Sequence, residues 1–81
     1  SELAIHTNRR LVGKLIKLHR KERGLSLQDL ANLLSTDRQY IWRIEKGHVN
    51  LSLDYLEKII FQLKCTHIDF FTPLINADFH K

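Results

Sequence analysis

The sequence predicts a compact, all-α fold built from five helices. Apolar residues recur at helical spacing over most of the chain, and no segment alternates over enough residues to indicate a strand. Capping and turn residues fall between the apolar stripes, where helices begin and end. The chain has 81 residues, 43% hydrophobic and 27% charged, which suits one small globular domain. We therefore interpret residues 1–81 as a single domain.

The first helix is predicted over residues 8–23. Its apolar residues lie at i, i+4 and i+7, with two more beside them: Leu11, Leu15, Leu18, Val12 and Ile16. Gly24 follows a basic last turn and tolerates the left-handed conformation in which helices often end.

The second and third helices are predicted to form a helix-turn-helix over residues 26–46. Ser26 is the expected N-cap of the second helix and Asp37 that of the third. The buried sides are expected to hold Leu27, Leu30, Ala31, Leu34, Ile41 and Ile44. Only Ser35 and Thr36 separate the two helices, so they must cross tightly, which is the geometry that lets a second helix enter the DNA major groove.

Two further helices are predicted after Gly47. Asn50 or Ser52 caps the fourth, whose buried stripe is Leu53, Leu56, Ile59, Ile60 and Leu63. Thr66 or His67 opens a short fifth helix that Pro73 is expected to stop.

The outer face of the third helix carries donors and aromatic residues: Arg38, Gln39, Tyr40, Trp42, Arg43 and Lys46. Arginine can bond guanine bidentately, and glutamine can bond adenine in the same way. Arg38 and Gln39 occupy the first turn, and Arg43 lies one turn beyond Gln39 on the same face. These residue types at this spacing are typical of base readout in duplex DNA.

The charge distribution also favours nucleic acid, ahead of a membrane surface. Residues 1–47 hold ten Lys/Arg and five Asp/Glu, whereas residues 48–81 hold three and four. A solvated basic face is the alternative interpretation. It is also the one we give to Lys14, Lys17 and Lys21, although one or two of them are within reach of flanking phosphates.

Other functional classes find no support in the sequence. A single cysteine excludes an intramolecular disulfide, and Cys65 is interpreted as a small apolar filler. The five histidines lack metal-binding spacing, and no phosphate-binding glycine loop or catalytic set occurs, so we expect no metal, cofactor or enzymatic activity. No apolar run approaches the roughly 20 residues of a membrane span, and the first ten residues lack a secretory signal, which predicts a cytoplasmic protein.

From the first helix to Phe71, the chain resembles the Cro/phage-repressor (lambda-repressor-like, XRE) type of helix-turn-helix domain. The matching positions are Leu30-Ala31, Leu34, Tyr40-Ile41-x-x-Ile44-Glu45-x-Gly47, Asn50-x-Ser52-Leu53 and Leu56. The resemblance implies five helices and a transcriptional regulator that binds a palindromic operator as a homodimer. It also implies base contacts by Arg38, Gln39 and Arg43, and backbone contacts by Tyr40, Lys46, His48 and Asn50.

Trp42 has alternative roles, and the resemblance also implies a structural ion pair. Trp42 can pack on thymine methyl groups or the sugar backbone, or be covered by the tail of the chain. The resemblance pairs Arg20 with Glu45 as a structural, partly buried ion pair that fixes the third helix against the first.

The chain departs from the family pattern at three positions. Ser35 stands where the turn usually has glycine, and Leu51 stands where proline is frequent. Leu27 replaces a glutamine that often binds phosphate, so Gln28 or the helix amides would have to make that contact.

The tail, residues 66–81, is predicted to form the dimer interface. Its apolar residues exceed what a small core needs: Ile68, Phe70, Phe71, Leu74, Ile75 and Phe79. We assign five of them to the contact with a second copy: Phe70, Phe71, Leu74, Ile75 and Phe79. Alternatively, the tail wraps its own monomer. A rival function is an antitoxin or other interaction module that uses the same fold to bind a protein partner, and it would be recognised by a stoichiometric partner on purification.

Overall fold

The computed structural model describes residues 8–75, and this part of the chain is entirely helical, as predicted. The helices are α1 (Arg9–Glu22), α2 (Leu27–Leu33), α3 (Arg38–Glu45), α4 (Leu53–Gln62), α5 (His67–Phe71) and the 3₁₀ helix η1 (Thr72–Ile75). None of the helices in this range is long and apolar enough to cross a membrane.

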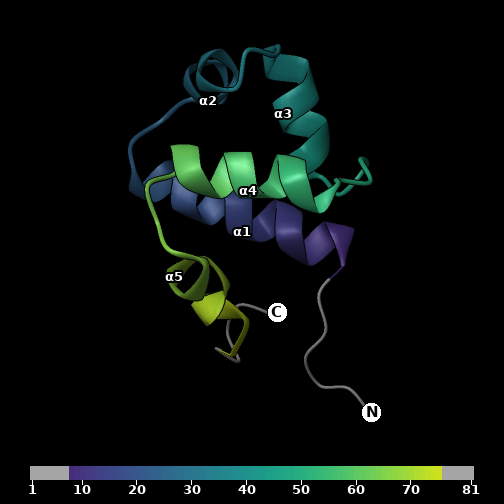
Figure 1. Ribbon diagram of the computed structural model, residues 1–81. Helices are drawn as coiled ribbons and strands as arrows, with labels where there is room; N and C mark the ends of the chain where they lie inside the picture. The colour runs from purple at the N-terminus through teal and green to yellow at the C-terminus, as the bar shows by residue number, and fades with distance from the viewer. Residues whose placement is uncertain (1–7, 76–81) are drawn as a thin grey trace.

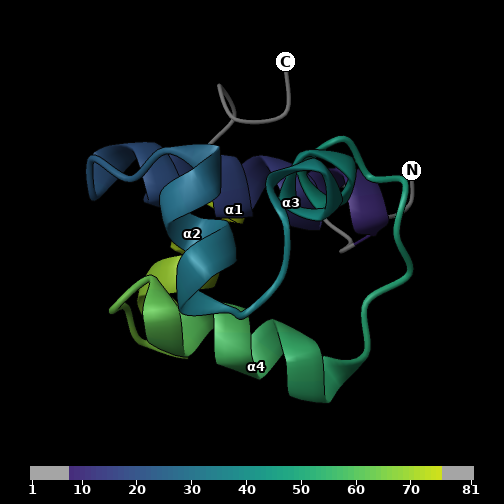
Figure 2. The same cartoon turned by 90° about the horizontal axis from the view of Figure 1, so that it is seen from above.

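The helices form two tiers with α5 beneath them (Figure 1). Seen from above, α1 and α4 lie on opposite sides, α2 crosses the space between them, and α3 is seen nearly end-on beside α1 (Figure 2). Both views place α5 on the side of α1 and α4 that faces away from α2 and α3. The helix-turn-helix and the C-terminal segment therefore occupy opposite ends of the molecule.

Each α-helix begins at a polar N-cap whose side chain accepts a backbone hydrogen bond: Asn8, Ser26, Asp37, Ser52 and Thr66. At α2 the cap is reciprocal, because the Asp29 carboxylate also accepts from the amide of Ser26 at 2.9 Å. The hydrogen bond from the Ser26 amide lowers the pKa of Asp29, and the Ser26 side chain adds a smaller effect in the same direction.

The core contains the apolar stripes of the helices, and its fully or nearly fully buried members are Val12, Leu15, Ile16, Leu30, Ala31, Ile41, Ile44, Ile59, Ile60, Leu63, Phe70 and Leu74. Leu27, Leu34 and Leu56 are only half-buried. Cys65 packs against the core, and its burial raises the pKa of the thiol, as expected of an apolar filler.

The prediction that Leu53 belongs to the buried stripe of α4 is wrong, because this side chain is 79% exposed. Leu53 is the first residue of the helix, directly after its N-cap, and it lies beyond the edge of the core. The buried face of α4 begins later in the helix, at Ile59 and Ile60.

The fifth helix has its predicted extent, but part of the predicted dimer contact is wrong. Thr66 caps α5, which ends at Phe71, two residues before Pro73; the chain continues as η1, where the missing N–H of Pro73 costs little. Phe70 and Leu74 are core residues of the chain itself and are not available for a dimer contact. Phe71 is half-buried, Ile75 is 75% exposed, and Phe79 lies outside the described residues.

His19 fixes Phe70 in the core. Its Nε2 atom lies 3.1 Å from the carbonyl oxygen of Phe70, and the two rings stack with centroids 5.2 Å apart. Both residues are buried, so this contact joins α1 to α5 away from water. The apolar pattern of the tail alone does not predict this contact, because His19 lies 51 residues earlier in the chain.

Gly13 lies where α1 passes closest to the end of α3. A Cβ atom on this residue would come 2.5 Å from the carbonyl oxygen of Glu45 and 2.6 Å from that of Ile44. Both neighbours are backbone atoms, so no side-chain rotation relieves the contact, and the two helices would have to move apart.

We therefore expect Gly13→Ala to lower the free energy of unfolding by about 1–3 kcal/mol, the usual cost of overpacking a well-packed contact. Alanine gains about 1 kcal/mol of helix propensity over glycine, which reduces the net loss. Urea unfolding followed by far-UV circular dichroism measures the change. Lys21→Ala on the exposed face of α1 is the matched control and should stay within about 0.5 kcal/mol. A Gly13→Ala variant more stable than the parent would contradict the close approach.

Candidate nucleic-acid interface

The outer face of α3 is polar and accessible along its whole length. Ile41 and Ile44 are 1% and 2% exposed and anchor the helix in the core. The exposed residues of the same helix and its C-cap are Arg38, Gln39, Trp42, Arg43 and Lys46. The structure thus separates an apolar inner face from an outer face of hydrogen-bond donors, as base readout requires.

The turn that presents α3 contains a strained residue. Ser35 has φ of 56°, the left-handed region in which glycine is favoured. Ser35 therefore takes a left-handed conformation at the position where the family resemblance implies glycine. Asp37 then starts α3 by accepting from the amide of Tyr40 at 2.7 Å.

A buried ion pair holds α3 against α1. The Nε atom of Arg20 donates to Oε2 of Glu45 at 2.6 Å, and Nη2 donates to Oε1 at 3.0 Å. The remaining Nη1 donates to the carbonyl oxygen of Leu25 at 2.9 Å, so the guanidinium also fixes the loop before α2. Arg20 and Glu45 are 6% and 9% exposed, and the bidentate geometry gives the pair one defined orientation. This is the pairing that the family resemblance implies.

Trp42 is 44% exposed and lies between two polar neighbours. The ammonium group of Lys46 is 5.6 Å from the centre of the indole ring, and the His48 ring meets it edge-on at 6.0 Å. The cation and the ring edge hold the indole in place while part of its face stays accessible. Lys46 and His48, both predicted backbone contacts, thus share one cluster with Trp42.

The other predicted backbone contacts lie in different settings. Tyr40 is half-buried and meets Tyr55 of α4 edge-on, with ring centroids 6.1 Å apart. Gln28 is exposed and donates to the side-chain oxygen of Asn32 at 2.9 Å. Asn50 is exposed in the loop between α3 and α4, and the N-cap of α4 is Ser52 instead.

A groove of about 510 Å³ runs between α1 and α3, and we call it the basic groove. It is lined by Arg10, Lys14, Lys17, Arg20, Lys21, Leu27, Trp42, Glu45 and Lys46. Six of these nine side chains are cationic, and only Glu45 is anionic. Lys17 and Lys21 are exposed, as the solvated-face interpretation expects, but the sequence alone does not predict the groove. The helical spacing of Lys14, Lys17 and Lys21 is the signal that places them on one side of α1.

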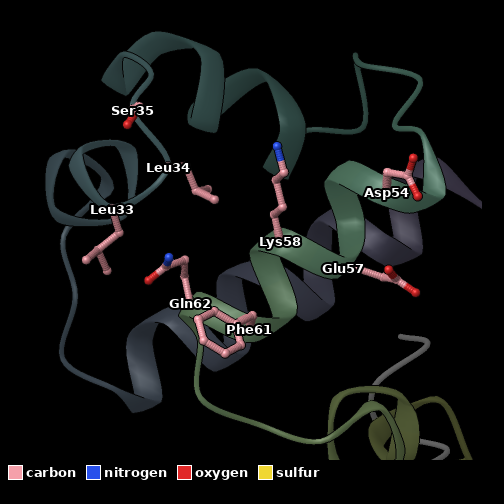
Figure 3. A pocket seen from close by; sticks show the side chains of 8 residues that line it. All are labelled: Leu33, Leu34, Ser35, Asp54, Glu57, Lys58, Phe61 and Gln62. Atoms are coloured by element: carbon pink, nitrogen blue, oxygen red, sulfur yellow. The ribbon is translucent and has the colours of Figure 1, made fainter.

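A second groove, of about 790 Å³, lies between the turn after α2 and the length of α4. Figure 3 shows Leu33, Leu34 and Ser35 on one side of it and Phe61 and Gln62 on the other. Its charged residues are Asp54, Glu57 and Lys58, so the carboxylates outnumber the cation. The charge of the lining residues therefore favours an anionic ligand in the basic groove over this one.

No group of three or more histidine, cysteine, aspartate or glutamate residues within 8–75 is arranged to hold a metal ion. α3 and the basic groove together offer directional donors, a partly exposed aromatic ring and a concentration of positive charge.

Comparisons with known proteins agree with this geometry. A helix-turn-helix family model matches residues 16–70. The transcriptional regulator SlrR of Bacillus subtilis is 36% identical over 50 residues, which cover 60% of this chain and 33% of SlrR. An uncharacterized helix-turn-helix transcriptional regulator of Methanothermobacter thermautotrophicus is 40% identical over 55 residues, 68% of this chain and 80% of that protein. The chain thus spans about a third of the first relative and most of the second.

Among solved structures, the restriction-modification controller protein C.Esp1396I is 38% identical with a TM-score of 0.74, covering 82% of this chain and 87% of that chain. The same controller protein has also been solved as a tetramer in complex with its natural 35 base-pair operator. The family model, the relatives and the shared fold lead to one conclusion: the chain belongs to the helix-turn-helix family, in its Cro/phage-repressor (XRE) type.

Proposed function

We propose that this protein is a sequence-specific DNA-binding transcriptional regulator that reads its site with α3. The observation that carries the proposal is the outer face of α3, where Arg38, Gln39 and Arg43 are exposed on a helix whose inner face is fixed in the core. The relatives named as transcriptional regulators and the operator complex of C.Esp1396I support it.

In this proposal, the three residues of α3 hydrogen-bond to base edges in the major groove. Trp42 lies beside them, and its accessible face suits thymine methyl groups or sugars. The backbone is held by residues at the rim of that face: Gln28, Tyr40, Lys46, His48 and Asn50. Gln28 must exchange its hydrogen bond with Asn32 for one to phosphate.

Selection from a random-sequence duplex library, followed by footprinting, tests the proposal. On the selected site, Arg38→Ala, Gln39→Ala and Arg43→Ala should each cost about 1–3 kcal/mol of binding free energy, with a much smaller effect on random DNA. Lys46→Ala should weaken both kinds of binding similarly, since phosphate contacts carry no sequence information. If all four variants weaken selected and random DNA in the same ratio, α3 is not the reading element.

We also propose that the regulator acts as a homodimer on a palindromic site. One small module buries little surface, whereas two copies related by a two-fold axis place two recognition helices about 34 Å apart, one DNA turn. The available apolar surface near the C-terminus is Ile68 and Ile75, which are 79% and 75% exposed, together with the accessible part of Phe71. Because α5 lies away from α3, a second copy bound there leaves the α3 face accessible.

A further inference from the structure

The side of α1 that faces the basic groove is a row of four cations. Arg10, Lys14, Lys17 and Lys21 follow one another at i, i+4, i+7 and i+11, which places them on one side of the helix. Arg10, Lys17 and Lys21 are exposed, and all four line the groove. Like charges at this spacing repel one another, so the row favours an anionic partner.

The carboxylate in this groove does not offset the row. Glu45 already accepts two hydrogen bonds from Arg20 and is 9% exposed. Lys17 and Lys21 have no ion-pair partner among residues 8–75. The charges of Lys17 and Lys21 therefore stay available to a ligand.

The shape and position of the groove indicate which polyanion it suits. Its lining on α1 extends from Arg10 to Lys21, and its other wall includes Trp42, beside the proposed reading residues of α3, and Lys46, a proposed backbone contact at the C-cap of α3. Leu27, at the start of α2, lines the same groove and offers no polar group to a phosphate. A phosphodiester strand in this groove would therefore meet the α1 lysines, whereas Leu27 gives it no hydrogen-bond donor.

We propose that the basic groove is a second DNA subsite, in which Lys17 and Lys21 of α1 hold the phosphodiester backbone next to the bases that α3 reads. This inference rests on the proposed function, since it needs duplex DNA on α3. It extends the contact surface from the helix-turn-helix to α1. It also places Trp42 between the bases that α3 reads and the phosphodiester backbone that Lys17 and Lys21 hold.

The experiment compares salt dependence in two charge-matched variants. Lys17→Gln/Lys21→Gln removes two groove cations, and Lys58→Gln/Lys64→Gln removes two exposed cations from α4 and the loop after it. Binding to the selected duplex is measured between 50 and 200 mM KCl by the fluorescence of Trp42, the single tryptophan of the chain, which lines the groove. The slope of log affinity against log salt should fall by about 1.8 for the groove variant, about 0.9 for each lost phosphate contact. It should stay unchanged for the α4 variant.

The position of the subsite on the DNA is found by replacing single charged phosphates with uncharged methylphosphonates. Single methylphosphonate substitutions are placed along the duplex, and those that the parent protein senses beside the α3 site should have no further effect on the groove variant. Equal slope changes in the two variants, or unchanged methylphosphonate sensitivity in the groove variant, would overturn the subsite. Competition by tripolyphosphate as strong as that by duplex DNA would identify a free polyphosphate site instead. If the unsubstituted protein prefers no duplex sequence, the proposed function fails, and that result is obtained before any lysine is changed.

Discussion

Glu45→Ala should lower the free energy of unfolding by about 3–5 kcal/mol, because it leaves the Arg20 guanidinium buried without its carboxylate. The total stability of a domain this small is about 5 kcal/mol, at the low end of the usual range, so much of the variant should be unfolded at room temperature. Urea unfolding monitored by far-UV circular dichroism measures the change. The effect is large because two helices and the loop before α2 depend on one guanidinium.

The control for this prediction removes both charges. Arg20→Met/Glu45→Met leaves no buried charge, and replacement of a buried pair by apolar residues is often neutral or stabilising. The double variant should therefore recover most of the stability that the single variant loses. Glu45→Ala within about 1 kcal/mol of the parent would show that the pair is solvated and that α3 is held by apolar packing alone.

Ile68→Asp/Ile75→Asp should convert the proposed dimer into folded monomers and weaken operator binding by about 10²–10⁴-fold. The loss reflects the end of two-site binding, in which the second module binds at high effective concentration. Both side chains are more than 70% exposed, so their replacement leaves the core intact. Phe71 is not replaced, because it packs against the core and its substitution would also change the stability of the monomer. Sedimentation velocity gives the mass, and titration of the selected operator gives the affinity.

Phe61→Asp is the control for an aspartate placed on an exposed apolar position elsewhere, since Phe61 is 69% exposed on α4; it adds one negative charge where the dimer variant adds two. It should remain dimeric and bind the operator as the parent does. An unsubstituted protein that sediments as a monomer at tens of micromolar would refute the dimer. A stoichiometric partner on purification would favour the antitoxin-like alternative.

Local chemistry made most of the fold predictable. The caps Ser26 and Asp37 satisfy the first amides of their helices from within four residues, so the sequence alone locates the starts of α2 and α3. The outer face of α3 is equally predictable from the sequence, because Ile41 and Ile44 determine which side of the helix is buried. These features depend on neighbours in sequence and need no knowledge of tertiary contacts.

The errors concern residues whose surroundings come from distant parts of the chain. The sequence predicts an exposed Phe70 because His19, which packs against it, is distant in the chain. The sequence predicts a buried Leu53 because the apolar pattern of the helix does not show where the core ends. Gly13 has no local signature, because its role is set by the carbonyl groups of α3 that pass over it. The lysines of α1 were identified, but their groove exists only once α3 is packed beside them.

The packing of α1 has a consequence for DNA spacing. One part of this helix contacts α3 through Gly13 and the Arg20 pair, and His19 contacts the segment proposed to bind a second copy. A single rigid helix of 14 residues thus connects the reading element to the proposed two-fold axis. In the proposed dimer, α1 would therefore set the distance and rotation between the two reading helices. The number of base pairs between the proposed half-sites would then depend on residues of α1 that contact no base.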